Sequence, residues 1–213
     1  MRRTLKRFVV FASGRGTNLE NIIRQIRAGK IKGELALVFS DQRGSGALKI
    51  SRRYKIDALC LARNEFVSKE DFEKEILTAL RERKVDFIVL AGYMKIVGPV
   101  LLNAFPRKIL NIHPALLPSF RGAHAIQDAY DSGAKVTGVT VHFVDAEVDH
   151  GPILLQKKVR VEARDSLKSL EKKIHAAEYE IYPRAIQLFV DGKRRISGRK
   201  VMILKSRVPR RRQ

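Results

Sequence analysis

The sequence of 213 residues is poor in the residue types that build disulfide-linked, cysteine-ligated and membrane proteins. Its one cysteine, Cys60, excludes an internal disulfide and makes a metal site with several cysteine ligands untenable. No apolar run is long enough to cross a bilayer, and the first residues lack the apolar stretch and cleavage site of a secretory signal. These absences favour a cytoplasmic protein in which Cys60 is a buried core thiol.

Acidic residues are also scarce, because 22 Asp and Glu stand against 43 Lys and Arg, and the formal net charge is +21. Such a charge normally indicates a nucleic acid or an acidic ligand. Much of the excess lies at the two ends, in residues 2–7 and after Asp191, so the body of the chain is only mildly basic. Aromatic side chains are not interleaved with the basic clusters, so binding of nucleic acid by base stacking is not expected.

What the chain does have is 45% hydrophobic residues, enough for the core of one α/β domain. Short β-rich runs alternate with amphipathic stretches, a pattern typical of parallel strands connected by helices. We therefore expect a Rossmann-like, mostly parallel twisted sheet with helices on both faces, formed by residues 1–192. The basic extension, 193–213, is expected to be irregular or strand-like at first and frayed at its end, without forming a separate domain.

The apolar runs and stripes place the main elements of this fold. Strands are predicted at 8–12, 34–40, 58–61, 87–91 and 109–112, followed by two strands at 138–144 and 153–161. Apolar stripes predict helices around 19–26 and 72–80, and Ser68 is a candidate cap for the second. A long helix is expected at 166–189. The loop between the last two strands carries Asp149.

The loop 13–18, with sequence Ser-Gly-Arg-Gly-Thr-Asn, lies between a predicted strand and a predicted helix. Backbone N–H groups and the helix dipole favour an anion at such a place. Leu19 replaces the third glycine of a dinucleotide fingerprint, and the Gly-Lys-Ser/Thr of a P-loop is absent. Thr17 and Asn18 add side-chain donors, so we favour phosphate binding over a tight turn that uses the two glycines only for backbone geometry.

A second polar group lies at the end of the strand predicted at 109–112, where open α/β sheets collect ligands. Asn111 and His113 are two residues apart, so an extended backbone places both side chains on one face. Asn111 can donate to a developing oxyanion, an interaction typically worth about 3 to 4 kcal/mol in the transition state. His113 can supply a second donor and move a proton near neutral pH.

Asp149 precedes a Gly-Pro turn that is able to aim its carboxylate inward, and a carboxylate beside His113 would favour the imidazolium. The three side chains lack a nucleophile, which indicates acyl transfer through a tetrahedral intermediate. Each also has a plainer interpretation: a strand-end amide, a structural histidine and a solvated loop acid. His142 is interpreted as core-adjacent structure, and His124, after the mobile-looking segment 116–122, as a weaker candidate on a lid.

Five motifs occur in the order found in one family. They are SGRGTN at 13–18, LAGYM at 90–94, NIHPALLP at 111–118, GVTVHFVD at 138–145 and DHGPI at 149–153. From Phe8 to about Asp191 the sequence is similar to the phosphoribosylglycinamide formyltransferase family, folate-dependent enzymes of purine synthesis. The resemblance implies the formyltransferase fold and transfer of a formyl group from 10-formyltetrahydrofolate, as co-substrate, to the amine of glycinamide ribonucleotide. It also implies no metal and no covalent enzyme intermediate.

The resemblance assigns roles residue by residue. Asn111 would bind the formyl oxygen, His113 would donate a proton, and Asp149 would raise the pKa of the histidine. The acceptor substrate would be held by Gly16, Thr17 and Asn18 at its phosphate, and by Glu178 from the last helix. The folate would contact Lys69, Met94, Lys95, Ile96, Val97, Asn111, Asp145, Ala146, Glu147, Val148 and Asp149. Without the resemblance, Glu178 would be read as a solvated helix face, and the three apolar residues of 94–97 as core packing.

Two features of the sequence differ from the pattern of this family, and three other functions are alternatives to formyl transfer to glycinamide ribonucleotide. Lys69 occupies a position where an arginine is expected, and lysine offers a point charge in place of a bidentate fork. The basic tail is not a family requirement. Methionyl-tRNA formyltransferase shares the trio and a substrate loop similar to 117–127, but it normally carries an RNA-binding domain for which too few residues follow Asp191.

A formyltetrahydrofolate hydrolase would carry an N-terminal regulatory domain, and none precedes Phe8 in this sequence. A nucleic-acid-binding protein would explain the charge but leave the trio at Asn111, His113 and Asp149 without purpose. The expected partners are therefore small-molecule substrates, with no membrane, no nucleic acid, and a homodimer left open.

Overall fold

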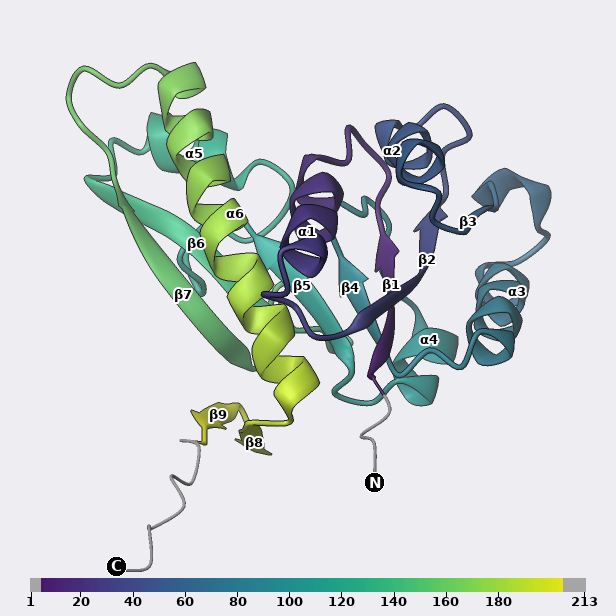
Figure 1. Ribbon diagram of the computed structural model, residues 1–213. Coiled ribbons are helices and arrows are strands. Elements are labelled where there is room, and N and C mark those ends of the chain that lie inside the picture. Colours follow the sequence, from purple (N-terminus) through teal and green to yellow (C-terminus); the bar gives the residue numbers. More distant parts are fainter. Residues whose placement is uncertain (1–4, 205–213) are drawn as a thin grey trace, which may run out of the picture.

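The computed structural model describes residues 5–204, which form a seven-stranded sheet covered by helices on both faces (Figure 1). The strand order is β3-β2-β1-β4-β5-β6-β7. The first five strands in this order are parallel, whereas β6 runs antiparallel to both β5 and β7. The expected fold class, a mostly parallel α/β sheet with helices on both faces, is confirmed.

The predicted strands are found within a few residues of their expected bounds. They are β1 (Arg7–Phe11), β2 (Glu34–Ser40), β3 (Ala58–Cys60), β4 (Phe87–Leu90), β5 (Ile109–His113), β6 (Val136–Phe143) and β7 (Ile153–Arg160). Because β6 and β7 are antiparallel, a loop joins them directly, and this loop carries Asp149. It returns over the sheet beside the carboxyl end of β5, where a ligand is expected.

Three helices agree with the apolar stripes in the sequence: α1 (Thr17–Arg27), α3 (Lys69–Glu82) and α6 (Leu167–Asp191). The predicted cap of α3 is present, since the Ser68 hydroxyl accepts from the Asp71 backbone N–H at 3.0 Å. The stripes do not predict four shorter elements. These are α2 (Gly46–Tyr54), a 3₁₀ turn (Arg63–Glu65), α4 (Pro99–Ala104) and α5 (Ala125–Asp131).

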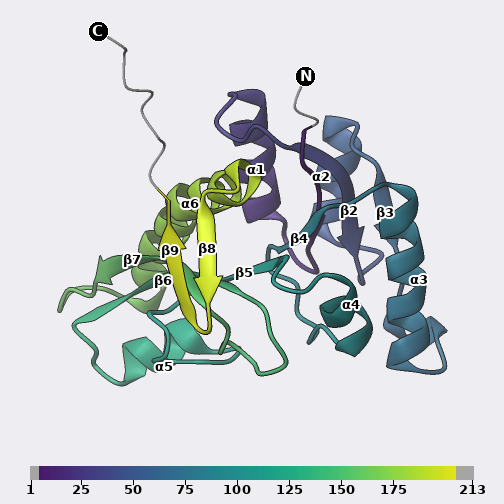
Figure 2. The same cartoon turned by 90° about the horizontal axis from the view of Figure 1, so that it is seen from below.

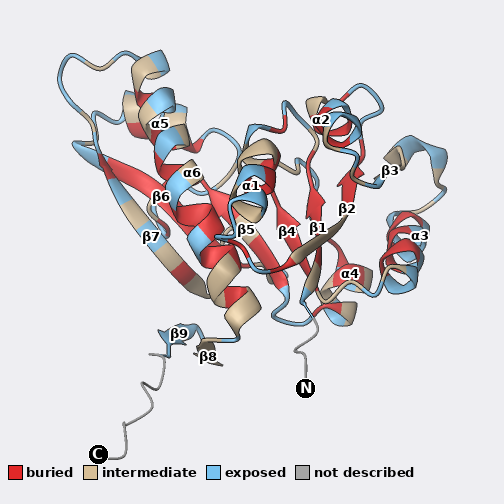
Figure 3. Ribbon diagram, viewed as in Figure 1, coloured by how far each residue is buried: buried red, intermediate tan, exposed pale blue. Residues whose placement is uncertain are grey.

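The core consists of two layers, because alternate residues of each central strand point to opposite faces. In β1, Phe8 and Val10 pack with α1, α2 and α6, whereas Val9 and Phe11 pack with α3 and α4. All four of these side chains are fully buried. Both faces of the central strands are therefore covered, and exposed residues gather in the connecting loops and on the outer faces of the helices (Figure 3).

Cys60 lies at the end of β3, the edge strand of the sheet. Its side chain is half-buried, so the expectation of a fully buried core thiol was wrong. The physical reason is its position, since an edge strand is paired on one side only. Partial burial raises the pKa of the thiol above its usual value. No helix among residues 5–204 is long and apolar enough to cross a membrane.

The first part of the basic extension forms a hairpin of β8 (Arg194–Ser197) and β9 (Lys200–Ile203), which pair only with each other as a two-stranded sheet within the described residues (Figure 2). This confirms its strand-like character, whereas the end that is expected to be frayed lies outside the described residues. The Arg194 guanidinium lies 3.4 Å from the centre of the Phe189 ring and donates to the Phe189 carbonyl at 2.8 Å. Arg194 thereby attaches the hairpin to the end of α6.

Replacing Arg194 by alanine is expected to lower the free energy of unfolding by about 1 kcal/mol or more, because a partly desolvated cation–π contact and a hydrogen bond are lost. Arg195→Ala is the matched control, since Arg195 is the exposed neighbour on the same strand. Urea unfolding of both variants measures the difference. Equal stabilities would show that Arg194 does not anchor the hairpin.

Candidate active site

The pairing of β5 with its neighbours builds the floor of the site. Asn111 and His113 point to the same face of β5, and the antiparallel register places Asn111 opposite His142 and His113 opposite Thr140. His113 and His142 are almost completely buried, whereas Asn111 is half-buried. The two-residue spacing therefore brings an amide and an imidazole to one surface, as the sequence predicted.

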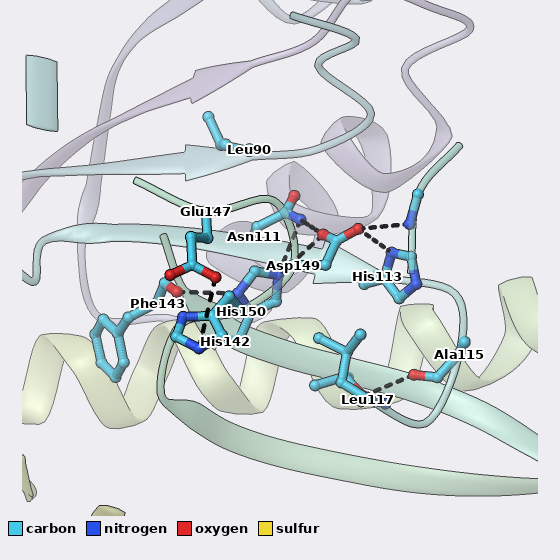
Figure 4. Close-up of polar contacts among 12 residues, drawn as sticks. Leu90, Asn111, His113, Ala115, Leu117, His142, Phe143, Glu147, Asp149 and His150 are labelled. Atoms are coloured by element: carbon cyan, nitrogen blue, oxygen red, sulfur yellow. Dashed lines mark hydrogen bonds and ion pairs between the residues drawn. The ribbon is translucent and has the colours of Figure 1, made fainter. Parts of the chain in front are cut away.

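Asp149 lies between these side chains (Figure 4). One carboxylate oxygen, Oδ2, is 3.3 Å from His113 Nδ1 and accepts from the Gly122 backbone N–H at 3.0 Å. The other, Oδ1, is 3.5 Å from Asn111 Nδ2. The predicted turn aims the carboxylate, because Asp149 has a left-handed backbone with φ of 50°. The structure thus brings Asn111, His113 and Asp149 together.

Gly151 is what allows the Asp149 loop to approach the sheet so closely. A side chain at this position would collide with the backbone carbonyl of Phe143. The loop therefore passes directly over the end of β6, and Asp149 is held beside the strand pair that carries Asn111 and His113.

His142 is a member of this cluster that the sequence reasoning missed. Its Nε2 is 3.1 Å from Asn111 Nδ2 and 3.5 Å from Asp149 Oδ1, and its Nδ1 is 2.9 Å from the Phe143 carbonyl oxygen. The interpretation of His142 as a strand residue next to the core was right about its burial, but incomplete about its contacts. Only the register of β5 and β6 could have revealed them, and periodicity does not give that register.

The pKa values of His113 and Asp149 differ from the expectation in one respect. Burial lowers the pKa of His113, while the Phe120 carbonyl and the Asp149 carboxylate act in the opposite direction without overcoming it. Asp149 therefore favours the imidazolium, as expected, but the net pKa of His113 is not raised. For Asp149, burial alone would raise the pKa, yet the His142 and Gly122 contacts and the nearby imidazoles together lower it.

Both ring nitrogens of His113 face acceptors. Nε2 is 2.7 Å from the Phe120 carbonyl oxygen, and Nδ1 faces Asp149. A neutral imidazole carries one N–H and can donate to only one of these acceptors, whereas an imidazolium can donate to both. The lowered pKa favours the neutral ring, and the two acceptors would stabilise the imidazolium if the ring took up a proton.

The segment 116–122, considered a lid from the sequence, is bonded into the cluster through the Phe120 carbonyl and the Gly122 N–H. Thr140 anchors its beginning, since the hydroxyl donates to the Ala115 carbonyl at 2.6 Å. His124, the weaker candidate, is exposed at the start of α5 and makes no hydrogen bond or ion pair with the trio within residues 5–204.

A cavity of about 410 Å³ opens beside the cluster. Its lining includes every predicted folate residue except Lys69, namely Met94, Lys95, Ile96, Val97, Asn111, Asp145, Ala146, Glu147, Val148 and Asp149. Three of the apolar residues are well exposed, with 71% for Met94, 64% for Ile96 and 50% for Val148. Core packing, the plainer interpretation, therefore fails for Met94 and Ile96, whereas Val97 is buried and does pack in the core.

Lys69 lines a second cavity of about 320 Å³, together with Arg63 and Phe72. The segment 93–96 lines both cavities and forms the wall between them. Lys69 thus lies next to the predicted folate residues but apart from the trio.

The loop 13–18 is shaped by Gly16, which has a left-handed backbone with φ of 78° and immediately precedes α1. A Cβ at Gly16 would lie 2.9 Å from the Ile50 side chain, so glycine is needed for space as well as for conformation. Thr17 is exposed at the first turn of the helix. The loop therefore presents the N-terminus of α1 to solvent, as an anion site requires.

Glu178 is connected to this loop and is not a solvated side chain, since it is only 5% exposed. Its Oε2 accepts from Asn18 Nδ2 at 3.0 Å and lies 2.9 Å from His175 Nδ1. The hydrogen bond to Glu178 raises the pKa of His175. Asn18, His175 and Glu178 thus form a second polar cluster between α1 and α6. Among residues 5–204, no group of three or more His, Cys, Asp or Glu side chains is arranged to hold a metal ion.

Comparisons with known proteins show which family the chain is similar to. Residues 6–186 match the formyl transferase family. A curated relative, the phosphoribosylglycinamide formyltransferase of Bacillus subtilis (strain 168), is 38% identical over 183 residues, covering 86% of this chain and 94% of the relative. The crystal structure of glycinamide ribonucleotide transformylase 1 from Symbiobacterium toebii is 44% identical with a TM-score of 0.92, covering 94% of this chain and 95% of that one.

A more distant structure, a formyltetrahydrofolate deformylase from Pseudomonas syringae pv. tomato str. DC3000, has a TM-score of 0.88 at 26% identity, covering 95% of this chain and 67% of that chain. The family match spans most of the chain, and the Bacillus subtilis relative aligns over 94% of its own length at 38% identity. The chain therefore belongs to the formyl transferase family.

Proposed function

We propose that the protein transfers the formyl group of 10-formyltetrahydrofolate to the amine of N1-(5-phosphoribosyl)glycinamide, in de novo purine biosynthesis. The observation that carries this proposal is the meeting of Asn111, His113 and Asp149 at one side of a cavity with an apolar wall. An amide donor, a proton carrier and a carboxylate are the groups that direct formyl transfer needs.

The formyl donor would occupy the cavity lined by 94–97 and 145–149. The exposed side chains of Met94, Ile96 and Val148 offer an apolar surface to a flat ring system. Lys69, at the second cavity, would meet a carboxylate of the folate tail as a point charge. The donor is a co-substrate that leaves as tetrahydrofolate, and no metal takes part in the proposed reaction.

The acceptor would place its phosphate at the loop 13–18. The backbone N–H groups of Gly16, Thr17 and Asn18 and the dipole of α1 would bind the anion. Glu178, bonded to Asn18, would contact the same substrate from α6. Its carboxylate can accept hydrogen bonds from ribose hydroxyls or from the glycinamide nitrogens.

The chemical step would begin when the acceptor amine attacks the formyl carbon. Asn111 Nδ2 would donate to the formyl oxygen as it becomes an oxyanion. The new C–N bond forms while the amine loses a proton, and the bond from carbon to N10 of the folate breaks as N10 gains one. His113, neutral before the reaction, would accept the amine proton at Nε2, which requires the Phe120 carbonyl to move away from that nitrogen, and would return the proton to N10.

Asp149 would stabilise the imidazolium that exists between these two proton transfers. Its carboxylate is 3.3 Å from His113 Nδ1, and its lowered pKa keeps it charged at neutral pH. His142 would hold the Asn111 amide in place, because its Nε2 can accept from Asn111 Nδ2 while its Nδ1–H donates to the Phe143 carbonyl. No nucleophilic side chain takes part, so the formyl group would pass directly between the substrates.

We further propose a cytoplasmic enzyme whose partners are these small molecules, with no role in binding nucleic acid. Residues 193–213 would be an extension of the catalytic domain 1–192, because the hairpin β8–β9 is attached to α6 through Arg194.

The assay that tests the proposal offers three acceptors in parallel with 10-formyltetrahydrofolate: glycinamide ribonucleotide, methionyl-tRNA and water. We expect kcat/KM to be highest for glycinamide ribonucleotide, with one tetrahydrofolate released per formylated product. The Asp149→Asn variant, purified in the same way, controls for contaminating activity. A preference for methionyl-tRNA, or release of formate at the same rate without an acceptor, would contradict the proposal.

A further inference from the structure

Ser13 opens the anion-binding loop, yet its hydrogen bonds lead to the wall of the formyl-donor cavity. Its backbone N–H donates to the Gly92 carbonyl at 3.0 Å. Its hydroxyl oxygen accepts from the Met94 backbone N–H, also at 3.0 Å. One residue of the acceptor loop is therefore bonded at two points to the turn that begins the segment 92–97.

Asp41 fixes the orientation of this hydroxyl. The Ser13 Oγ–H donates to Asp41 Oδ1 at 2.6 Å, and Asp41 is only 3% exposed at the end of β2. Because the single hydroxyl proton is directed to the carboxylate, a lone pair remains for the Met94 N–H. The other carboxylate oxygen of Asp41 accepts from Gln42 Nε2 at 3.1 Å, which holds the carboxylate itself.

The segment 92–97 is packed at Tyr93 and Val97 and open to solvent between them. Tyr93 packs against the Phe11 and Phe39 rings and Val97 is buried, whereas the side chains of Met94 and Ile96 are 71% and 64% exposed, so backbone hydrogen bonds add to the positioning of these two residues. At its far end, the buried carboxylate of Glu73 accepts from the backbone N–H of Gly98. Ser13 at the near end and Glu73 at the far end therefore hold the wall of the donor cavity, and only Ser13 belongs to the acceptor loop.

We propose that Ser13, oriented by Asp41, is a positioning residue that sets the Met94–Ile96 wall and couples the two substrate subsites. A phosphate bound by the loop 13–18 restrains Ser13, and Ser13 in turn restrains the wall against which the folate packs. Binding of the acceptor then strengthens binding of the donor. By thermodynamic linkage, binding of the donor strengthens binding of the acceptor by the same factor. This inference rests on the proposed function for the identity of the two ligands, but the hydrogen bonds exist without them.

The first test measures the hydrogen bond itself and needs no ligand. Amide hydrogen exchange of Met94 is compared in the wild type, Ser13→Ala and Ser51→Ala. Ser51 is the matched control, since it is a fully buried serine whose hydroxyl donates within α2. We expect the Met94 amide to exchange at least about tenfold faster in Ser13→Ala only, because its acceptor is removed. Unchanged exchange would overturn the inference.

The second test measures coupling with tetrahydrofolate as the probe. Without a formyl group no reaction occurs, so its dissociation constant is measured by calorimetry with and without saturating glycinamide ribonucleotide. In the wild type we expect the ribonucleotide to tighten tetrahydrofolate binding. In Ser13→Ala we expect tetrahydrofolate to bind about fivefold more weakly, the effect of one lost hydrogen bond, and the tightening to disappear.

Ser13→Thr keeps the hydroxyl, so we expect it to restore both the tetrahydrofolate affinity and the tightening by the ribonucleotide. Ser51→Ala is expected to behave as the wild type. Equal tetrahydrofolate affinity and equal tightening in Ser13→Ala and the wild type would overturn the coupling. If the wild type binds no tetrahydrofolate at all, the proposed function fails and the coupling fails with it. The exchange of the Met94 amide still decides whether Ser13 holds the wall.

Discussion

Asp149→Asn is expected to lower turnover on the order of 100-fold or more while the protein stays folded. The amide has nearly the same shape, but it lacks the charge that would stabilise the His113 imidazolium across the 3.3 Å contact. The hydrogen bond from the Gly122 N–H can persist to the amide oxygen. Steady-state kinetics with both substrates saturating measures the effect.

The control for this experiment is His150→Gln, which lies in the same loop and outside the predicted folate contacts. The His150 ring lies 3.1 Å from the Asp145 carboxylate, and within residues 5–204 it makes no hydrogen bond or ion pair with His113. A drop in turnover of similar size in both variants would mean that disturbance of the loop, and not loss of the Asp149 charge, is responsible. Near-normal turnover in Asp149→Asn would remove this residue from the mechanism.

Asn111→Ala is expected to reduce kcat about 100- to 1,000-fold, which corresponds to about 3 to 4 kcal/mol of lost transition-state stabilisation. The amide nitrogen is the group directed toward His142 and Asp149 at the edge of the cavity, where a formyl oxygen would lie. Because the oxyanion is present in the tetrahedral intermediate and the transition states around it, but not in the bound substrates, KM should change much less than kcat. Initial rates over a range of both substrates separate the two constants.

Asn21→Ala provides a matched control, since this half-buried amide donates to the Tyr179 carbonyl at 2.9 Å, outside the catalytic cluster. It should retain nearly full kcat. A loss of activity in Asn111→Ala that appears only as a higher KM would assign Asn111 to substrate binding and contradict its role at the oxyanion.

The central strands could be predicted from the sequence because β1, β2 and β4 are apolar on both faces and bounded by polar loops. The two-residue spacing of Asn111 and His113 likewise predicts a shared face once the strand is recognised. The short helices α4 and α5 have too few residues for a clear apolar stripe. Tertiary contacts, and not local periodicity, determine them.

The site was predictable only in part. The turn at Gly151 indicates that Asp149 can point inward, but the distance to His113 depends on how the loop returns over β5. His142 was assigned to structure because a strand histidine gives no local signal of function. Its place opposite Asn111 follows from the antiparallel register of β5 and β6, a long-range property.

The direction of the His113 pKa shift could not be predicted from the sequence, for a similar reason. A neighbouring carboxylate predicts a raised pKa, and that contribution is present. The depth of burial, however, depends on the whole fold, and here it outweighs the charge. Burial in the folded structure therefore favours a neutral His113 at rest, which under the proposed mechanism would be protonated during the reaction.

The most direct test of the catalytic account is an NMR titration of the His113 ring in the wild type and in Asp149→Asn, with the signal assigned by its loss in His113→Gln. We expect a wild-type pKa below the ordinary value of 6.5 and a still lower pKa in Asp149→Asn, because the carboxylate acts to raise it. A His113 pKa that is unchanged or higher without the carboxylate would contradict the account, since Asp149 would then not stabilise the imidazolium.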